Sequence, residues 1–178
     1  MGCEIRHMDE NEWLMVAEFS TGDVRTAGML DVDTVYFMVQ RTIRAIYPSF
    51  YEPDVVEAFC RLHNRDAIAS DIGMGKVFLF DGDGTPVGTG TLDGCHVKRV
   101  FVLPDHQGCG IGSSVMNALE SLASASHGIV MLDSSRPAEQ LYLNRGYRVV
   151  SEDTWEITAE DEFLATTLKY KVMEKNLN

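Results

Sequence analysis

The sequence predicts a mixed α/β (α+β) fold, and three observations support this prediction. Apolar residues recur at helical spacing between positions 33 and 72. From Lys76 onward they alternate with a period of two, around an Asp-Gly turn typical of a β-hairpin. Strand-like and helix-like segments then follow one another to the end of the chain. Elements in this order form a sheet layer covered by helices.

The first half of the chain is predicted to be mostly helical. A short strand is expected near residues 3–7. An amphipathic helix follows over residues 33–47, because Asp is a favoured helix cap and the apolar residues share one face. Two prolines interrupt this pattern before it resumes over residues 55–63. A further short helix is expected over residues 64–72, and two glycines then end the helical region.

Three strands are predicted in the centre of the chain. Residues 77–80 and 87–92 pair as a hairpin around the turn Asp81-Gly82-Asp83-Gly84. A third strand covers residues 96–103 and runs directly into a glycine-rich loop.

The remaining segments alternate between helix and strand. The helix after the loop has an apolar stripe made by Val115, Met116, Leu119, Leu122 and Ala123. A strand over residues 129–132, a short helix that ends at Gly146, and an extended segment over residues 147–150 come next. In the last strand, residues 164–172, apolar and polar residues alternate, so one face is expected to be buried and the other exposed to solvent.

The composition indicates a single domain spanning residues 1–178. The 178 residues are 45% hydrophobic, and no internal repeat or long linker divides them. The chain has 27 Asp plus Glu against 15 Lys plus Arg, which gives a formal charge of −12. We therefore expect no nucleic-acid partner. An acidic surface is better suited to a cationic small substrate. No apolar run reaches the roughly 18 residues that span a bilayer, so we expect no membrane contact and a cytoplasmic location.

The cysteines are predicted to be reduced thiols. Cys3, Cys60, Cys95 and Cys109 lack the C-x-x-C and Cys/His spacings of zinc sites, so no bound metal is expected. Cys95 and His96 could suggest a nucleophile and its base, but neighbours on a strand point to opposite faces and cannot share a proton. Cys95 is therefore interpreted as a small buried hydrophobe.

A glycine-rich loop, Gln107-Gly108-Cys109-Gly110-Ile111-Gly112-Ser113, joins the third central strand to a helix. Glycine lets backbone N–H groups approach a ligand, and successive N–H groups at a helix start bind a phosphate or pyrophosphate. Ser113 stands where a dinucleotide-binding fingerprint needs glycine, and the single Gly-Lys pair of the chain lacks the other residues of a P-loop. The alternative to an anion site is a tight turn that binds no ligand.

The pattern Gln-x-x-Gly-x-Gly, after a strand ending in Leu103-Pro104, resembles the coenzyme A pyrophosphate loop of the GNAT superfamily of N-acetyltransferases. The resemblance covers about residues 76–150, including the hairpin strand Val87-Gly88-Thr89-Gly90 and the segment from Ala138 to Tyr147. It implies a mixed, mostly antiparallel central sheet of six to seven strands flanked by helices, with acetyl-CoA as co-substrate and no metal.

The same resemblance assigns cofactor binding to nine residues. Two strand residues would bond the pantetheine arm through their backbone groups, and the loop would bind the pyrophosphate. These residues are Phe101, Val102, Gln107, Gly108, Cys109, Gly110, Ile111, Gly112 and Ser113. Cys109 stands where similar loops commonly carry Lys or Arg, so a side-chain charge is missing and the backbone donors are expected to suffice.

Two residues are predicted to be catalytic. Tyr142 matches the family's usual general acid, because a phenol of pKa about 10 can protonate or hydrogen-bond a thiolate. Taken alone, a Tyr beside Leu141 would be interpreted as core packing. His96 falls near a position where similar enzymes often carry Glu, and its imidazole could take the ammonium proton directly or through water. Asp93, Glu139, an unassisted water chain and a purely structural histidine remain alternatives.

The resemblance implies direct acetyl transfer in a ternary complex to a primary amine, here of a small molecule. The aromatic segment over residues 46–52 either lines the amine pocket or packs helices onto the sheet. A protein or peptide N-acetyltransferase and a catalytically silent acyl-CoA-binding module are the other functions that the sequence leaves open. Dimers are common among similar proteins, so the resemblance also allows a homodimer.

Overall fold

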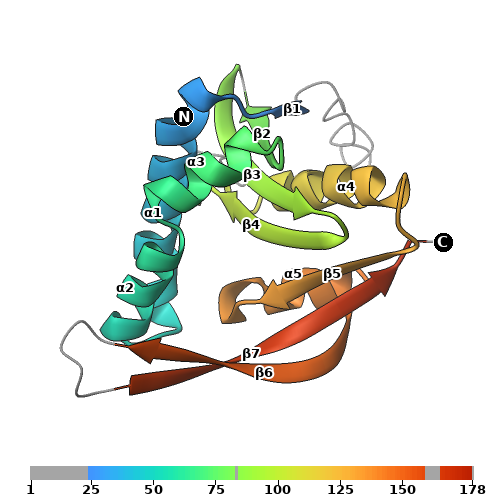
Figure 1. Cartoon of the computed structure of the whole chain (residues 1–178). Helices are drawn as coiled ribbons and strands as arrows, with labels where there is room; N and C mark the ends of the chain where they lie inside the picture. Colours follow the sequence, from blue (N-terminus) through green and yellow to red (C-terminus); the bar gives the residue numbers. More distant parts are fainter. Residues whose placement is uncertain (1–23, 83, 159–164, 178) are drawn as a thin grey trace, which may run out of the picture.

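A seven-stranded sheet in the order β1-β2-β3-β4-β5-β7-β6 forms the centre of the computed structural model (Figure 1). The structure describes residues 24–82, 84–158 and 165–177. The strands are β1 (Val24–Thr26), β2 (Val77–Gly82), β3 (Thr85–Asp93), β4 (His96–Val102), β5 (Ile129–Ser134), β6 (Arg148–Thr158) and β7 (Ala165–Asn176). Only β4 and β5 pair in parallel among these strands. The predicted mixed, mostly antiparallel sheet of six to seven strands flanked by helices is confirmed.

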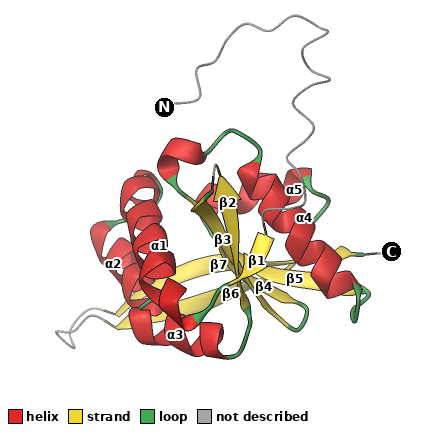
Figure 2. Cartoon of the chain, turned by 90° about the horizontal axis from the view of Figure 1, so that it is seen from above, coloured by secondary structure: helices red, strands yellow, loops and turns green. Residues whose placement is uncertain are grey.

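Helices cover both faces of this sheet (Figure 2). They are α1 (Val32–Ile46), α2 (Pro53–Leu62), α3 (Arg65–Gly73), α4 (Ile111–Ser124) and α5 (Glu139–Asn144). Short 3-10 turns cover Met29–Asp31, Tyr47–Ser49, Pro104–His106 and Arg136–Ala138. Helices α1 to α3 lie on one side of the sheet, and α4 and α5 lie on the other. Within the described ranges, no helix is long and apolar enough to cross a membrane.

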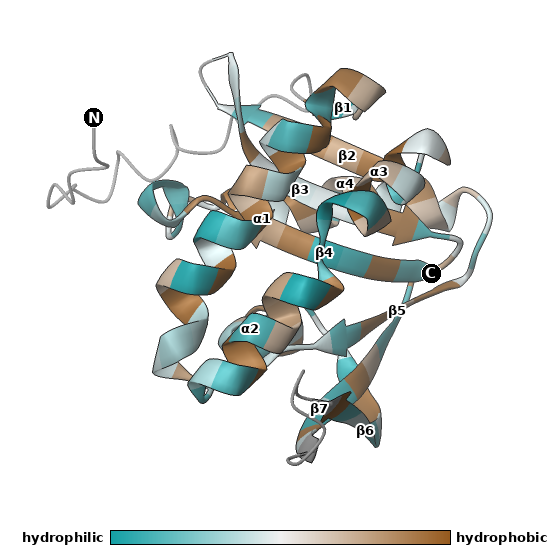
Figure 3. Ribbon diagram, turned by 60° about the vertical axis from the view of Figure 1, so that its left-hand side comes forward, coloured by the Kyte–Doolittle hydropathy of each residue, from teal (hydrophilic) through white to brown (hydrophobic). Residues whose placement is uncertain are grey.

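The apolar spacing of the helices explains how they dock. Hydrophilic and hydrophobic residues alternate along α1 and α2 (Figure 3), as expected for helices with one buried face. The buried apolar residues of α1 are Val32, Val35, Met38, Val39 and Ile43. Helices α1 to α3 share one hydrophobic core with the sheet, and α4 and α5 share a second core on the other side. The sheet is therefore buried on both faces where the helices cover it.

Helix α4 packs directly against β3 because two glycines leave room for it. A Cβ atom on Gly90 would stand 2.6 Å from Leu119 Cδ1, and one on Gly88 would stand 3.3 Å from Val115 Cγ2. These glycines belong to the hairpin strand on which the family resemblance rests. Their absent side chains let the helix sit close to the strand.

Several predicted elements need correction. The segment predicted to be extended over residues 147–150 is the start of β6, which continues to Thr158. The polar run after Val150 hides this strand in the sequence. Among the described strands, β6 lies at the sheet edge and pairs only with β7. Strand β1 was not predicted, since three residues carry no periodic signal. The strand expected near residues 3–7 and the turn residue Asp83 lie outside the described residues.

Candidate active site

Strands β4 and β5 separate after a short contact. Backbone pairing joins only His96 to Met131 and Val97 to Leu132. Beyond these pairs β4 continues to Val102 beside β3, while β5 continues to Ser134 beside β7. Among the described residues, the edge of β4 that faces β5 therefore has no strand partner from Lys98 onward. An open strand edge of this kind can bond an extended ligand as it would bond another strand.

A β-bulge lies along the open part of β4. The register joins Thr89 to Phe101 and Thr91 to Lys98, so two residues of β4 stand opposite one residue of β3. Arg99 lies in this bulge with a left-handed φ of 49°, which is uncommon for a residue other than glycine. Bulges of this kind turn backbone and side chains out of the regular ladder and often lie next to active sites.

The Arg99 side chain is fixed by two partners. Its guanidinium forms an ion pair with Asp71, and its Nε–H donates to His63 Nδ1 at 3.2 Å. The side chain is only 11% exposed, so the positive charge is neutralised inside the protein. Lys98 is bound in turn to Asp93, at 3.0 Å. The positive charges of Lys98 and Arg99 on β4 are therefore both paired with carboxylates.

The glycine-rich loop leads from β4 into the first turn of α4. Gly108 and Gly110 have φ angles of 77° and 83°, the left-handed conformation in which glycine carries no steric penalty. A Cβ at either position would meet no atom within 4 Å, so the backbone conformation, not crowding, favours glycine there. Gln107 Nε2 donates to the carbonyl oxygen of Val102 at 2.9 Å, which ties the loop to the end of the strand.

The N-terminus of α4 fits an anionic ligand. The first N–H groups of an α-helix have no acceptor within the helix, and the helix dipole adds positive potential there. In α4 these groups belong to Ile111, Gly112 and Ser113, and no side chain caps them. The predicted loop residues therefore come together at one point, next to the open edge of β4. The Cys109 Sγ lies 3.7 Å from the Gln107 carbonyl oxygen.

Tyr142 lies on α5 and lines the cavity at the β4–β5 separation. The residue is 6% exposed, and its ring contacts that of Tyr147 with centroids 5.7 Å apart. Burial, with a smaller contribution from Tyr47, raises the pKa of the Tyr142 hydroxyl above its ordinary value of 10. The hydroxyl therefore stays protonated at neutral pH and can act as a hydrogen-bond donor.

A buried carboxylate fixes α5 in place. Glu120 on α4 accepts hydrogen bonds from Arg145 Nε at 3.1 Å, Tyr147 Oη at 3.2 Å and Lys175 Nζ at 2.7 Å. Arg145 also reaches the carbonyl oxygen of Ser113 in the first turn of α4, at 3.4 Å. The residues that follow Tyr142 are therefore joined to the helix start that belongs to the glycine-rich loop.

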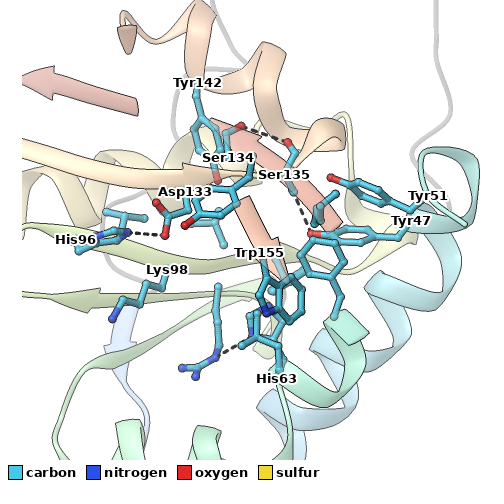
Figure 4. A pocket seen from close by; sticks show the side chains of 18 of the residues that line it. Tyr47, Tyr51, His63, His96, Lys98, Asp133, Ser134, Ser135, Tyr142 and Trp155 are labelled. Carbon is cyan, nitrogen blue, oxygen red and sulfur yellow. Dashed lines mark hydrogen bonds and ion pairs between the residues drawn. The ribbon is translucent and has the colours of Figure 1, made fainter. Parts of the chain in front are cut away.

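His96 lies at the point where β4 and β5 part. Its Nε2 atom is buried without a hydrogen-bond partner among the described residues and lies 3.4 Å from Asp133 Oδ2 (Figure 4). Asp133 is 48% exposed, so this carboxylate, not the histidine nitrogen, is open to the cavity. No local pattern predicts this pair, because its members are 37 positions apart.

The alternative bases considered from the sequence are placed differently. Asp93 is bound by Lys76 and Lys98, and these two hydrogen bonds lower its pKa to about 2. Glu139 is paired with Lys171 at 2.5 Å. Neither carboxylate lines the cavity described next.

A cavity of about 480 Å³ occupies the separation between β4 and β5. It is bounded by β4 residues from His96 to Phe101, by Tyr142, and by Asp133, Ser134 and Ser135 at the end of β5. Figure 4 shows that Tyr47, Tyr51 and Trp155 close other sides of the same space. The aromatic segment between α1 and α2 thus lines the cavity and also packs in the core.

The sequence profile of the acetyltransferase (GNAT) domain family matches residues 48–158, which is more than half of the chain. The chain belongs to this family. The resemblance to the GNAT superfamily that the sequence analysis found is therefore confirmed, and the domain is that of an acyltransferase.

Solved GNAT structures share the fold. A GCN5-related N-acetyltransferase (aminotransferase, class II) from Rhodopseudomonas palustris is 25% identical, with a TM-score of 0.76 over 86% of this chain and 94% of that chain. The PaiA N-acetyltransferase from Thermoplasma acidophilum, in complex with coenzyme A, is 14% identical, with a TM-score of 0.66 over 86% and 98% of the two chains. YncA, a putative acetyltransferase from Salmonella typhimurium with its cofactor acetyl-CoA, is 14% identical, with a TM-score of 0.62 over 87% and 93%. No curated protein matches this chain in sequence.

The described residues contain no cluster of three or more His, Cys, Asp or Glu side chains arranged to hold a metal ion. Cys60, Cys95 and Cys109 are not joined in a disulfide bond, and Cys3 lies outside the described residues.

Several cavity residues escaped the sequence analysis, and three of them matter for the chemistry or shape of the site. They are Asp133, Trp155 and His63. The alternation of Trp155 and Ile157 with polar neighbours was a usable signal, since it continues the strand beyond Val150. His63 was assigned only to a helical stripe, and its contact with Arg99 depends on the bulge, which no local pattern predicts.

We predict that Glu120→Ala lowers the free energy of unfolding by about 3 kcal/mol, because it leaves Arg145 and Lys175 partly buried without their partner. Urea unfolding measures this loss. Glu57→Ala is the matched control, since Glu57 and Arg44 are both about half exposed and their ion pair is worth at most about 1 kcal/mol. Equal losses in the two variants would show that the Glu120 network does not stabilise α5.

Proposed function

We propose that this GNAT protein is an N-acetyltransferase that transfers an acetyl group from acetyl-CoA to the primary amine of a small molecule, directly within a ternary complex. One observation carries the proposal: a single cavity joins the open edge of β4, the Tyr142 ring and the His96–Asp133 pair. Its volume of about 480 Å³ falls within the range typical of small-molecule sites, which favours a small acceptor over a protein.

The chain's own residues suit acetyl-CoA. The N–H groups at the start of α4 and the left-handed glycines of the loop offer backbone donors to a pyrophosphate. The edge of β4 without a strand partner, which includes Phe101 and Val102, offers bonds to an extended pantetheine arm, and the Val102 carbonyl oxygen already accepts from Gln107 Nε2. When bound, acetyl-CoA supplies an activated acetyl thioester. The Thermoplasma and Salmonella proteins, which share the fold, hold coenzyme A and acetyl-CoA respectively, and this supports the assignment.

Asp133 and His96 act on the amine. An ammonium group entering the cavity meets the exposed Asp133 carboxylate, which binds and orients it. His96 Nε2, 3.4 Å behind that carboxylate, accepts the first proton once Asp133 shifts aside or a water bridges the gap. The nitrogen lone pair is then free to form the bond to the acetyl carbon.

Tyr142 acts on the departing sulfur. As the new C–N bond forms, the C–S bond breaks and its electron pair stays on sulfur. The Tyr142 hydroxyl donates a hydrogen bond to that sulfur, and because burial makes this phenol less acidic than a thiol, it keeps its own proton at the end of the step. The second proton lost by the nitrogen completes the thiol. The proton held by His96 leaves to solvent, which balances the reaction.

Release of free thiol from acetyl-CoA over a broad library of amines tests the proposal. We expect release with at least one small primary amine and acetylation of its nitrogen by mass spectrometry. Activity confined to peptides would replace the small-molecule acceptor by a peptide. Tight binding of acetyl-CoA with no release on any amine would instead favour a catalytically silent acyl-CoA-binding module.

We predict that Tyr142→Phe lowers kcat by about 100-fold, because the sulfur loses its hydrogen-bond donor during departure. The ring and its packing on Tyr147 are retained, so the dissociation constant for acetyl-CoA should stay within about twofold of the wild-type value. Steady-state kinetics and calorimetry measure the two quantities. An unchanged kcat would remove Tyr142 from the mechanism and leave it a core residue.

We predict that His96→Gln lowers kcat by about 100-fold, since glutamine can fill the space beside Asp133 but cannot accept the proton. Thermal unfolding of the variant, measured in parallel, separates this effect from a loss of folded protein. A folded variant with wild-type kcat would exclude His96 as the base and leave water to carry the proton.

A further inference from the structure

One side of the cavity is a continuous aromatic wall. Its members come from the turn after α1, from α2 and from β6. Tyr47 and Phe59 have ring centroids 4.9 Å apart, Tyr51 and Phe59 are 5.3 Å apart, and Phe59 and Trp155 are 5.5 Å apart. These four residues, Tyr47, Tyr51, Phe59 and Trp155, are called the aromatic wall below. They all line the cavity.

The hydroxyl groups of the wall are already bonded within the protein. Tyr47 Oη donates to Ser135 Oγ at 3.2 Å, and Tyr51 Oη accepts from the backbone N–H of Arg136 at 2.7 Å. Tyr47 therefore has no proton left to donate to a substrate carboxylate, whereas Tyr51 keeps its own O–H as a donor. The wall therefore offers mainly ring faces and edges to a ligand.

The side chains of the wall are uncharged, and the Arg136 guanidinium, 5.4 Å from the Tyr51 ring centroid, does not line the cavity. Burial and the charge of Arg99 lower the pKa of His63 to about 3, so this histidine is neutral at physiological pH. Burial raises the pKa of Tyr47 to about 12, so its hydroxyl stays protonated. Asp71 is neutralised by Arg99. A substrate with several cationic groups therefore finds no second free carboxylate among the described lining residues, since Asp133 is the other acidic one.

The charged end of the cavity lies a short distance from the wall. Asp133 is exposed, whereas Ser135, two residues further along an extended backbone, already contacts Tyr47. Two extended residues span about 6.5 Å. An amine bound at Asp133 therefore reaches the aromatic wall through a linker of only a few atoms.

We infer that the acceptor is a primary amine joined by a short linker to an aromatic or bulky apolar group, which packs on the aromatic wall while its ammonium group binds Asp133. This inference rests on the proposed function, because it names the acceptor for the same site. Such an amine matches both ends of the cavity. A polyamine or an amino alcohol matches only one.

Comparison of three amines tests the inference: 2-phenylethylamine, ethanolamine and spermidine. We expect kcat/KM for 2-phenylethylamine to exceed that for each of the others at least tenfold, measured by thiol release from acetyl-CoA. A higher value for spermidine or ethanolamine would overturn the inference while leaving N-acetyl transfer intact.

Binding to the protein loaded with coenzyme A gives a readout that does not depend on turnover. Calorimetry should show 2-phenylethylamine binding at least tenfold more tightly than ethanolamine or spermidine. If none of the three amines is acetylated, this ranking still decides the inference, and only the proposed catalysis fails. Equal or reversed affinities would overturn the inference.

Substitutions in the wall locate the binding. Trp155→Ala should raise KM for 2-phenylethylamine about tenfold and leave KM for ethanolamine within about twofold, because only the first amine touches the ring. Trp155→Leu, which keeps apolar packing on the core, should show the same selectivity if the alanine variant does not fold. Phe37→Leu is the matched control, since Phe37 is 63% exposed on α1 and does not line the cavity. Equal effects of the Trp155 variants on both amines would contradict the inference.

Discussion

The parallel pairing of β4 and β5 is the constraint on which the rest of the structure depends. Parallel neighbours cannot be joined by a tight hairpin, so the chain must cross over one face of the sheet, and α4 makes that crossing. The start of α4 therefore lies at the end of β4, beside the place where the two strands separate. The loop that suits an anion and the strand edge that suits an extended chain are adjacent because the topology requires it, and the bulge at Arg99 lies along the same opening.

The two cores hold the two sides of this opening independently. On one side, the turn between α1 and α2 carries Tyr47 and Tyr51, and α2 carries Phe59. The partly buried Arg99–Asp71 pair joins α3 to β4. On the other side, Glu120 collects Arg145, Tyr147 and Lys175, and so joins α4, the segment after α5 and β7. These charged groups would be costly to bury alone, but each has a partner of opposite charge. Their ion pairs join the elements that border the cavity.

Local sequence patterns predicted most helices and strands, but they do not predict which distant segments pair with one another. The helix predicted over residues 33–47 is α1, the hairpin around residues 81–84 joins β2 and β3, and the glycine-rich loop precedes α4 as expected. Tyr142 and His96, which the family resemblance singled out, both line the cavity. The sequence analysis missed Asp133 and Trp155, because their place depends on the separation of β4 from β5 and on the register of β6 with β7. The sequence analysis also missed the full length of β6, because the residues that follow Val150 are mostly polar.

The position of Trp155 on an edge strand has an evolutionary consequence. Among the described strands, β6 pairs only with β7, so a substitution in β6 breaks no ladder hydrogen bond of β4, the strand that carries the bulge and leads into the glycine-rich loop. The acceptor end of the cavity is thus shaped in part by a strand that carries none of the residues suited to the coenzyme. A directed-evolution library confined to Thr154 and Trp155, the β6 residues that line the cavity, with the buried Ile157 retained, would explore acceptor choice without changing the donor site.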